Sequence, residues 1–379
     1  GGAAARSASR ASMAGTTRTW ALMEVCGGQT HAILRWGLDQ LLPAPLRLIH
    51  GPGCPVCVTP AETLDAAIAL AGQPGVIPAY YGDMLRVPGS NGSSLLSARA
   101  AGGDVRVITA AGQALELAQR HPERQVVLLA VGFETTAPAT ALLARQTLAL
   151  GLANLSILTA HVRVAPAMEA LLAEQPAAPP SPVQGFLAAG HVAAVSGTGA
   201  LQRLVARRQR PVVVSGFSAE ELLRAVLACV GQLEAGEARL TNAYSTVVRP
   251  GGNGAARRLL REVFSVVDRP WRGLGVIPGG GLALRGAFQA LEARLRFGLP
   301  LEPSPRAAIP SPGPCRAGAV LGGRILPSQC PAFASTCTPE HPLGAPMVSG
   351  EGACAAYFRC RGGIQRQSRG QHREVGASP

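Results

Sequence analysis

LRLIHGPGCPVCVTPAETLDAAIALAG, residues 46–72, is the stretch that most clearly indicates the fold class. A short, mostly apolar run is followed by a turn rich in Gly and Pro, and then by a long run of helix-forming residues. We expect a buried strand that leads into a helix, with Thr59 and Glu62 as a capping box and Pro60 at the first helical position. Strand, turn and helix in this order are typical of a parallel α/β sheet.

The same alternation continues on both sides of a Pro-rich linker at 175–182. Pro neither continues a helix nor fits a central strand, so we expect the linker to separate two doubly wound, Rossmann-like α/β units. Residues 22–175 form the first predicted unit, and residues 183–250 form the second, which includes a helix capped by Ser218 and Glu221. The expected strands are 46–50, 76–81, 105–109, 126–131, 155–160, 186–189 and 211–216.

The two ends of the chain and its last third differ from this pattern. Residues 251–360 are rich in Gly, Pro and Cys and gain too little from apolar burial to order themselves. We therefore expect an irregular C-terminal iron-sulfur domain that a bound metal centre organises. Residues 1–21 and 361–379 are polar or of low complexity, and we expect a disordered extension and a disordered tail.

The composition argues against several classes of protein. Hydrophobic residues make up 47% of the 379 residues, yet no apolar run reaches the roughly 18 residues of a membrane-spanning helix, so we expect no membrane partner. The net charge of +13 comes from arginines that are spread along the chain, which argues against a nucleic-acid partner. Nine cysteines without a signal-peptide pattern indicate metal or redox chemistry in a reducing compartment, the cytoplasm.

Cys54 and Cys57 lie on the turn between the expected strand at 46–50 and the helix that follows it. Free N–H groups and partial positive charge at a helix start favour a thiolate, so the pair suits a redox dithiol that closes a disulfide reversibly. Half of a zinc site is the alternative interpretation. No second C-x-x-C or His pair lies at a matching distance, which favours the redox role.

Two further motifs place polar side chains after apolar runs. In MEVCGGQTH, Cys26 precedes two glycines, which allow a ligand to approach the backbone closely, and His31 could share that ligand. In AVGFETTAPAT, the side chains of Glu134, Thr135 and Thr136 would lie at the carboxyl end of a strand, where α/β sheets bind ligands. The alternatives are a buried, structural cysteine and helix capping by the threonines.

Four cysteines near the end of the chain are separated by fourteen, six and sixteen residues. Four thiolates in irregular sequence suit an iron-sulfur cluster, whereas four-cysteine zinc sites usually show two close C-x-x-C pairs, which this array lacks. The four are Cys315, Cys330, Cys337 and Cys354. Cys229, in contrast, lies in a helical stretch, and we expect it to be core packing.

These motifs, together and in this order, resemble the HypD family of hydrogenase maturation proteins. The resemblance runs from about residue 22 to residue 357. It is carried by MEVCGGQTHAI, GPGCPVCVTP, GDMLRVPGS, AVGFETTAP, GFLAAGHV and CTPEHPLGAPMVSGEGACAAY. The resemblance implies three α/β domains and a [4Fe-4S] cluster that is held by the four-cysteine array.

The resemblance also implies a function, that of a maturation factor for [NiFe]-hydrogenase. Such a factor assembles an Fe(CN)2CO group in complex with a HypC-type chaperone and a HypE-type cyanide donor. Cys26 would bind the transient iron with its CN and CO ligands, and the C-P-V-C pair would exchange electrons with the cluster. His31, Glu134 and His191 would orient ligands. The chain would then be a redox-active assembly scaffold rather than a conventional turnover enzyme.

The chain departs from the family pattern near the four-cysteine array. Pro346 stands where the family often has another Cys, and Ala317 replaces a Cys that is often seen two residues after the match to Cys315. Cys360 is a reserve ligand should Cys315 fail. Two other functions stay open: a general iron-sulfur-dependent thiol–disulfide oxidoreductase without iron cargo, and a structural zinc-bound scaffold.

Overall fold

The computed structural model describes residues 18–173, 182–300 and 313–361. The extension expected at 1–21, the tail expected at 361–379 and the linker at 175–182 lie almost entirely outside these residues. Within the described ranges, no helix is both long and apolar enough to cross a membrane.

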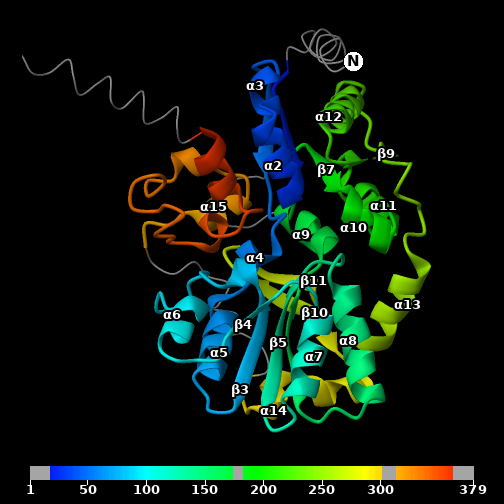
Figure 1. The fold of residues 1–379 in the computed structure, drawn as a ribbon. Coiled ribbons are helices and arrows are strands. Elements are labelled where there is room, and N and C mark those ends of the chain that lie inside the picture. Colours follow the sequence, from blue (N-terminus) through cyan, green and yellow to red (C-terminus); the bar gives the residue numbers. More distant parts are fainter. Residues whose placement is uncertain (1–17, 174–181, 301–312, 362–379) are drawn as a thin grey trace, which may run out of the picture.

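The chain forms two all-parallel sheets, which confirms the predicted α/β class with Rossmann-like units (Figure 1). The five-stranded sheet has the order β2-β1-β7-β8-β9, and the four-stranded sheet has the order β4-β3-β5-β6. The first contains β1 (Trp20–Glu24), β2 (Leu46–His50), β7 (Gly185–Ala189), β8 (Val212–Ser215) and β9 (Leu240–Asn242). The second contains β3 (Val76–Tyr81), β4 (Arg106–Ile108), β5 (Gln125–Gly132) and β6 (Leu155–His161).

The five-stranded sheet combines the beginning of the chain with its middle. β1 pairs with β2 on one side and with β7 on the other, where Leu22 is opposite Gly185. The sheets therefore differ from the expected units 22–175 and 183–250, because β1 and β2 join the strands of the second unit. The physical reason is packing: the helix α5 (Ala61–Ala71) follows β2 but packs on β3 of the other sheet, so the chain changes sheets after the C-P-V-C turn.

Of the two capping boxes predicted from the sequence, one is confirmed and one is wrong. The box predicted at Ser218 and Glu221 is confirmed, with Glu221 N–H donating to Ser218 Oγ over 3.2 Å and Ser218 N–H donating to Glu221 Oε2 over 3.0 Å. The box predicted at Thr59 is wrong, because Thr59 ends the short helix before α5 and its hydroxyl donates to the Pro55 carbonyl over 2.9 Å. In chain order the other helices up to the hairpin are α2 (Gly27–Arg35), α3 (Leu38–Leu41), α4 (Pro55–Val58), η1 (Gly82–Met84), α6 (Leu95–Ala100), α7 (Gly112–Arg120), α8 (Ala137–Ala149), α9 (Val164–Leu171), α10 (Gly190–Ser196), α11 (Gly199–Arg208), α12 (Ala219–Glu234) and α13 (Gly254–Val263).

An antiparallel hairpin follows the two parallel sheets. It consists of β10 (Phe264–Trp271) and β11 (Gly275–Leu284), and β11 packs on β6. The guanidinium of Arg269 fastens the hairpin to β6 by donating to the Thr159 carbonyl over 2.9 Å. Two short helices come next, η2 (Gly286–Leu291) and α14 (Ala293–Arg296).

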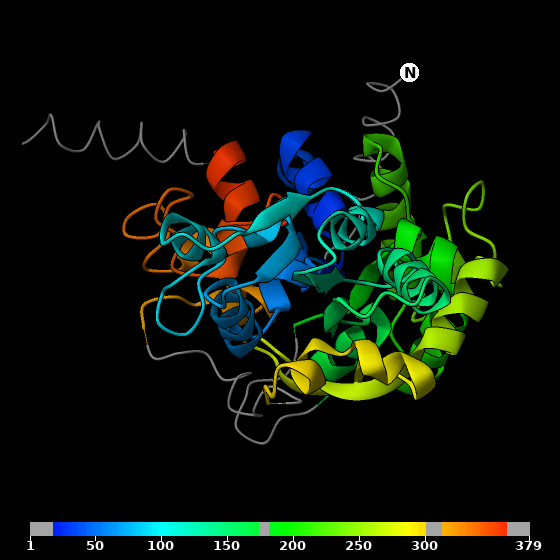
Figure 2. The ribbon, with the colours of Figure 1, turned by 60° about the horizontal axis from the view of Figure 1, so that its bottom comes forward.

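The irregular domain predicted for 251–360 is found only from residue 313 onward, because α13 and the hairpin occupy the first part of that range. Its regular elements are α15 (Ala317–Leu321), η4 (Pro327–Gln329), η5 (Ala345–Met347) and a helix at 353–361. Leu34 of α2 packs into its small core beside Phe333 and Met347. Figures 1 and 2 both show this orange and red segment against the blue N-terminal segment. Helix α2 therefore packs against the segment that carries Cys337 and Cys354.

Candidate functional site

Cys26 follows the carboxyl end of β1 and directly precedes α2. Its sulfur lies 3.8 Å from Nε2 and 3.9 Å from Nδ1 of His191. His191 comes after β7, the neighbour of β1, and its ring stacks on Phe217 with the ring centroids 5.0 Å apart. Parallel strands place their carboxyl ends at one edge of a sheet, so the structure brings together two site residues that the sequence separates widely.

Cys26 is almost completely buried, with 3% of its surface exposed. Burial raises the pKa of its thiol to about 12; the charge of Glu24 also raises it, while the backbone N–H of Gln29 lowers it. Such a thiol stays protonated at neutral pH unless a cation replaces the proton. Cys26 therefore suits the binding of a cation better than the role of a free nucleophile.

His31 lies on α2, five positions beyond Cys26. The imidazole in contact with the Cys26 sulfur is that of His191. His31 Nδ1 is buried and has no hydrogen-bond partner among the described residues. A role for His31 in the same site stays a prediction.

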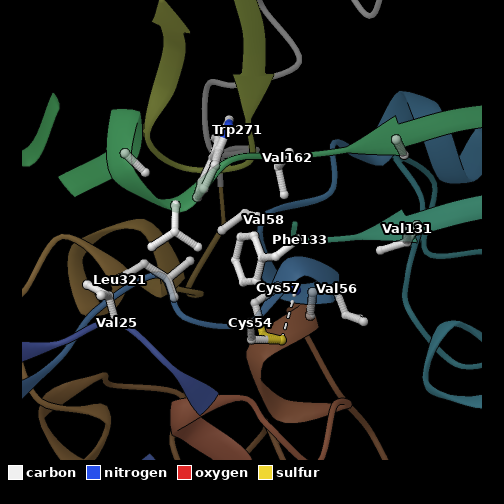
Figure 3. Packing of buried hydrophobic residues seen from close by; sticks show 14 of the residues in the cluster. Val25, Cys54, Val56, Cys57, Val58, Val131, Phe133, Val162, Trp271 and Leu321 are labelled. Carbon is white, nitrogen blue, oxygen red and sulfur yellow. Dashed lines mark hydrogen bonds between the residues drawn. A yellow bond between two sulfur atoms is a disulfide. The ribbon is translucent and has the colours of Figure 1, made fainter. Parts of the chain in front are cut away.

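Cys54 and Cys57 form a disulfide at the carboxyl end of β2. Cys54 caps α4, where its sulfur accepts a hydrogen bond from Cys57 N–H over 3.2 Å. The pair therefore lies at a helix start, but at that of α4 and not at that of the predicted helix, α5. Only 2% of Cys54 and 1% of Cys57 are exposed. Figure 3 shows the disulfide near Phe133 in a packed apolar environment, with Val56 and Val58 beside it. Both sulfurs are therefore almost completely shielded from solvent.

The loop of Cys26 and the loop before Cys54 are in direct backbone contact. Gly27 N–H donates to the Gly53 carbonyl over 2.8 Å, and Gly51 N–H donates to the Glu24 carbonyl over 2.8 Å. A Cβ atom on Gly53 would lie only 2.2 Å from the backbone nitrogen of Cys26. Glycine is therefore required at position 53 to bring the single cysteine and the disulfide together.

The four cysteines of the terminal array line one pocket. Its other lining residues are Ala317, Val320, Ala332, Phe333, Gly344, Pro346 and Met347. Ala317 and Pro346, the two departures from the family pattern, therefore face the same space as the cysteines. Cys360 is not among the lining residues and lies farther along the helix at 353–361, which leaves Cys315 as the better candidate ligand.

Electrostatics agree with a shared site for these thiols. Burial raises the pKa of Cys354, and the charges of the other three cysteines of the array raise it further. Burial raises the pKa of Cys337, whereas the hydrogen bond that Leu343 N–H donates to its sulfur over 3.4 Å lowers it. A Cβ atom on Gly344 would lie 2.7 Å from the Cys315 sulfur, so this glycine keeps space open beside that sulfur.

Four cysteine thiols around one pocket are the donor set of a [4Fe-4S] cluster and also of a four-cysteine zinc site. Zinc with four cysteines needs all sulfurs within about 2.3 Å of one centre. In a cubane each thiolate binds a different iron, so the sulfurs stand farther apart around a shared pocket.

The disulfide lies beside the cysteine pocket. α4 packs on η5, which lines that pocket. Arg272 interacts with both the disulfide segment and the cysteine pocket. Its backbone N–H donates to the Val58 carbonyl over 2.7 Å. Burial raises the pKa of Cys315, and the charge of Arg272 lowers it. The guanidinium also donates to the Pro88 carbonyl over 3.0 Å. Cys26, the disulfide and the pocket therefore form one continuous site.

Glu134 lies at the carboxyl end of β5, as predicted, but its contact is with a helix start. Both carboxylate oxygens accept from Val164 N–H, each over 3.3 Å, at the beginning of α9. Burial raises the pKa of this carboxyl, whereas Arg163 lowers it. The geometry gives Glu134 a helix-capping role, while its predicted role in orienting ligands stays a prediction. Thr136 makes no capping bond to α8 and instead donates to the Phe133 carbonyl over 3.2 Å.

A buried polar network that was not predicted from the sequence lies next to Cys26. Glu24 is 0% exposed and accepts from Cys26 N–H over 2.9 Å, from the Thr30 hydroxyl and from Nδ1 of His50 over 2.7 Å. Nδ1 is the donor because a carboxylate oxygen accepts. The sequence did contain a signal for this network, because Glu24 and His50 are polar residues within two otherwise apolar strands.

The comparisons with known proteins extend over all of these elements. The family model "HypD: Hydrogenase formation hypA family" matches residues 3–361. The chain is 45% identical over 353 residues to the hydrogenase maturation factor HypD of Azotobacter vinelandii, which covers 93% of this chain and 91% of that protein. It is 45% identical over 360 residues to the hydrogenase expression/formation protein HupD of Azotobacter chroococcum mcd 1, with 94% and 93% covered. It is 43% identical over 341 residues to the hydrogenase maturation factor HypD of Escherichia coli (strain K12), with 90% and 89% covered.

Proposed function

Because the chain belongs to the HypD family of hydrogenase maturation factors, we propose that it assembles the iron group of a [NiFe]-hydrogenase, Fe(CN)2CO. We propose that it does so in the cytoplasm, in complex with a HypC-type chaperone and a HypE-type cyanide donor. The observation that carries the proposal is the contact between three kinds of cysteine site. A single buried thiol, a disulfide and a four-cysteine pocket are linked by direct backbone and side-chain contacts.

In this proposal the iron is the substrate, and the thiolate of Cys26 is its ligand from this chain. The thiol loses its proton when the iron binds, which offsets the burial that otherwise disfavours the thiolate. His191 lies within 4 Å of the sulfur, and burial lowers the pKa of its imidazole, so it is neutral and can accept that proton or a hydrogen bond. Phe217 holds the imidazole in this orientation by stacking.

The proposed cofactor is a [4Fe-4S] cluster on Cys315, Cys330, Cys337 and Cys354. When bound, such a cluster would supply electrons one at a time. Reduction of the Cys54–Cys57 disulfide consumes two electrons and two protons and gives two thiols, so each reduction requires two single-electron deliveries from an external donor. Closing the disulfide again releases the same two electrons and two protons, and the proposed acceptor is the cyanide donor during ligand insertion.

Burial favours this internal role over a general thiol–disulfide oxidoreductase. An oxidoreductase that acts on protein disulfides needs an accessible thiol to attack its substrate. Here both sulfurs of the pair are almost fully covered, and α4 packs on η5, which lines the four-cysteine pocket.

Anaerobic purification after co-production with the HypC-type and HypE-type proteins tests the proposal. We expect iron and sulfide in the ratio of a cubane, together with infrared bands of cyanide and carbon monoxide. Iron and sulfide without those bands would support the oxidoreductase, and zinc without sulfide would support the structural scaffold. The amount of Fe(CN)2CO formed per chain over repeated cycles distinguishes the two modes of action. An assembly scaffold forms about one group per chain in each cycle, whereas a turnover enzyme forms many.

A further inference from the structure

The carboxylate of Glu24 is the most deeply buried charged group next to Cys26. It accepts three hydrogen bonds and is 0% exposed. A buried carboxylate costs several kcal/mol unless donors satisfy it, so its retention here calls for a role that an apolar side chain cannot fulfil. The proposed function uses Cys26, His191 and the disulfide but leaves Glu24 without a role.

The three donors to Glu24 come from three different segments. Cys26 N–H belongs to the loop after β1, the Thr30 hydroxyl belongs to the first turns of α2, and Nδ1 of His50 ends β2. One carboxylate therefore fixes the cysteine loop to its helix and to the neighbouring strand. The Cys26 backbone is extended at this point, with φ −150° and ψ 119°, which sets the direction of its side chain.

His50 extends the network towards the cysteine pocket. Nδ1 contacts Glu24, and Nε2 is buried without a hydrogen-bond partner among the described residues. The ring of Tyr357 lies edge-on to His50, with the ring centroids 5.3 Å apart and an interplanar angle of 74°. Tyr357 is on the same helix as Cys354, so the network contacts both the single cysteine and the segment of the array.

We propose that Glu24 is a positioning residue for Cys26, which keeps the sulfur facing His191 so that iron is captured between fixed groups. The inference rests on the proposed role of Cys26 as the iron ligand. Hydrogen-bond partners behind a metal ligand typically contribute about 10–100-fold to metal affinity because they orient it. Glu24 would act through the Cys26 backbone and need not touch the iron.

The test is anaerobic equilibrium dialysis of the full chain, loaded with its cluster, against ferrous iron, with bound iron counted in excess of cluster iron. Glu24→Gln keeps the shape of the side chain but replaces one accepting oxygen by a donor, so it cannot accept all three bonds. We expect ferrous affinity to fall about 10–100-fold. We also expect Cys26 to be alkylated faster than in the unchanged protein, as measured on its peptide by mass spectrometry.

Two further variants separate positioning from general loss of structure. Thr140→Val removes a buried hydrogen bond of 2.9 Å between the Thr140 hydroxyl on α8 and the imidazole of His161, which lies on β6 of the other sheet. This variant should leave ferrous affinity unchanged. Thr30→Val removes only one donor to Glu24 and should weaken ferrous binding less than Glu24→Gln does. If Glu24→Gln fails to fold, Thr30→Val decides the question.

The outcomes distinguish the inference from the function on which it rests. Undiminished ferrous binding in Cys26→Ala would overturn the proposed function itself. Loss of binding in Cys26→Ala with wild-type affinity in both Glu24→Gln and Thr30→Val would overturn the positioning role alone. An equal loss in Thr140→Val would also overturn it, because the effect would then come from any buried polar deletion.

Discussion

Replacing Gly53 by Ala should separate the two cysteine loops on which the account depends. The added Cβ would lie 2.2 Å from the nitrogen and 2.4 Å from the Cα of Cys26, and 2.5 Å from the carbonyl carbon of Val25. All three are backbone atoms, so no flexible side chain can move aside. The loops must move apart by about 1 Å to reach an ordinary contact.

This movement has a cost that follows from the contacts. Overpacking of a filled interior costs about 1–3 kcal/mol, and loss of the bond from Gly27 N–H to the Gly53 carbonyl adds about 1 kcal/mol. We therefore expect the free energy of unfolding to fall by about 2–4 kcal/mol. Cys26 should also shift relative to His191, so ferrous binding at Cys26 should weaken.

Guanidinium unfolding followed by circular dichroism measures the stability of Gly53→Ala, and equilibrium dialysis measures its ferrous binding. The matched control is Gly231→Ala, at an exposed position of α12 where a Cβ meets nothing within 4 Å. Ala favours a helix over Gly by up to about 1 kcal/mol, so the control should be neutral or stabilising. If Gly53→Ala were as stable as the control and bound iron normally, the proposed contact between the loops would be refuted.

Three other outcomes are expected. Cys337→Ser should bleach the brown colour and remove about four iron and four sulfide per chain. Cys229→Ala, in the core behind Gly185, should leave the colour unchanged. Metal and sulfide analysis of both variants tests this prediction. Trapping with an alkylating reagent should show that Cys54 and Cys57 react only after reduction, and labelling of both under oxidising conditions would contradict the disulfide. Burial lowers the pKa of His161 to about 4, so the unfolded state binds the proton first and stability should decline as pH falls from about 6.5 towards 4. His161→Gln should flatten that part of the curve in pH-dependent denaturation, and an unchanged slope would contradict it.

Much of the fold could be predicted because its signals are local. Apolar runs, Gly–Pro turns and the box at Ser218 identified strands and a helix start that depend on neighbouring residues. The sheet that β1 and β2 join was not predictable in this way, because it depends on pairing with β7, more than a hundred residues away. Thr59 shows the same limit at short range, because it ends the short helix α4 and therefore does not cap α5.

The site shows a similar division between chemistry and geometry. Cysteine spacing predicted which thiols belong to the array, and the structure places all four around one pocket. The contact of Cys26 with His191, the capping contact of Glu134 and the network of Glu24 arise from packing between distant segments. Contacts between distant segments do not produce a recognisable residue spacing in the sequence. The only sequence signal for them was the presence of polar residues in otherwise apolar strands.

The central claim, that Cys26 carries the iron, has one direct test. Infrared spectroscopy of the Cys26→Ala complex with the HypC-type chaperone, after co-production with the HypE-type protein, records the cyanide and carbon monoxide bands beside the absorbance of the cluster. The account predicts that the bands vanish while the cluster absorbance and chaperone binding stay unchanged, because a small substitution at Cys26 should cost only about 1 kcal/mol of stability. Persisting cyanide bands would contradict the account and show that another residue holds the iron.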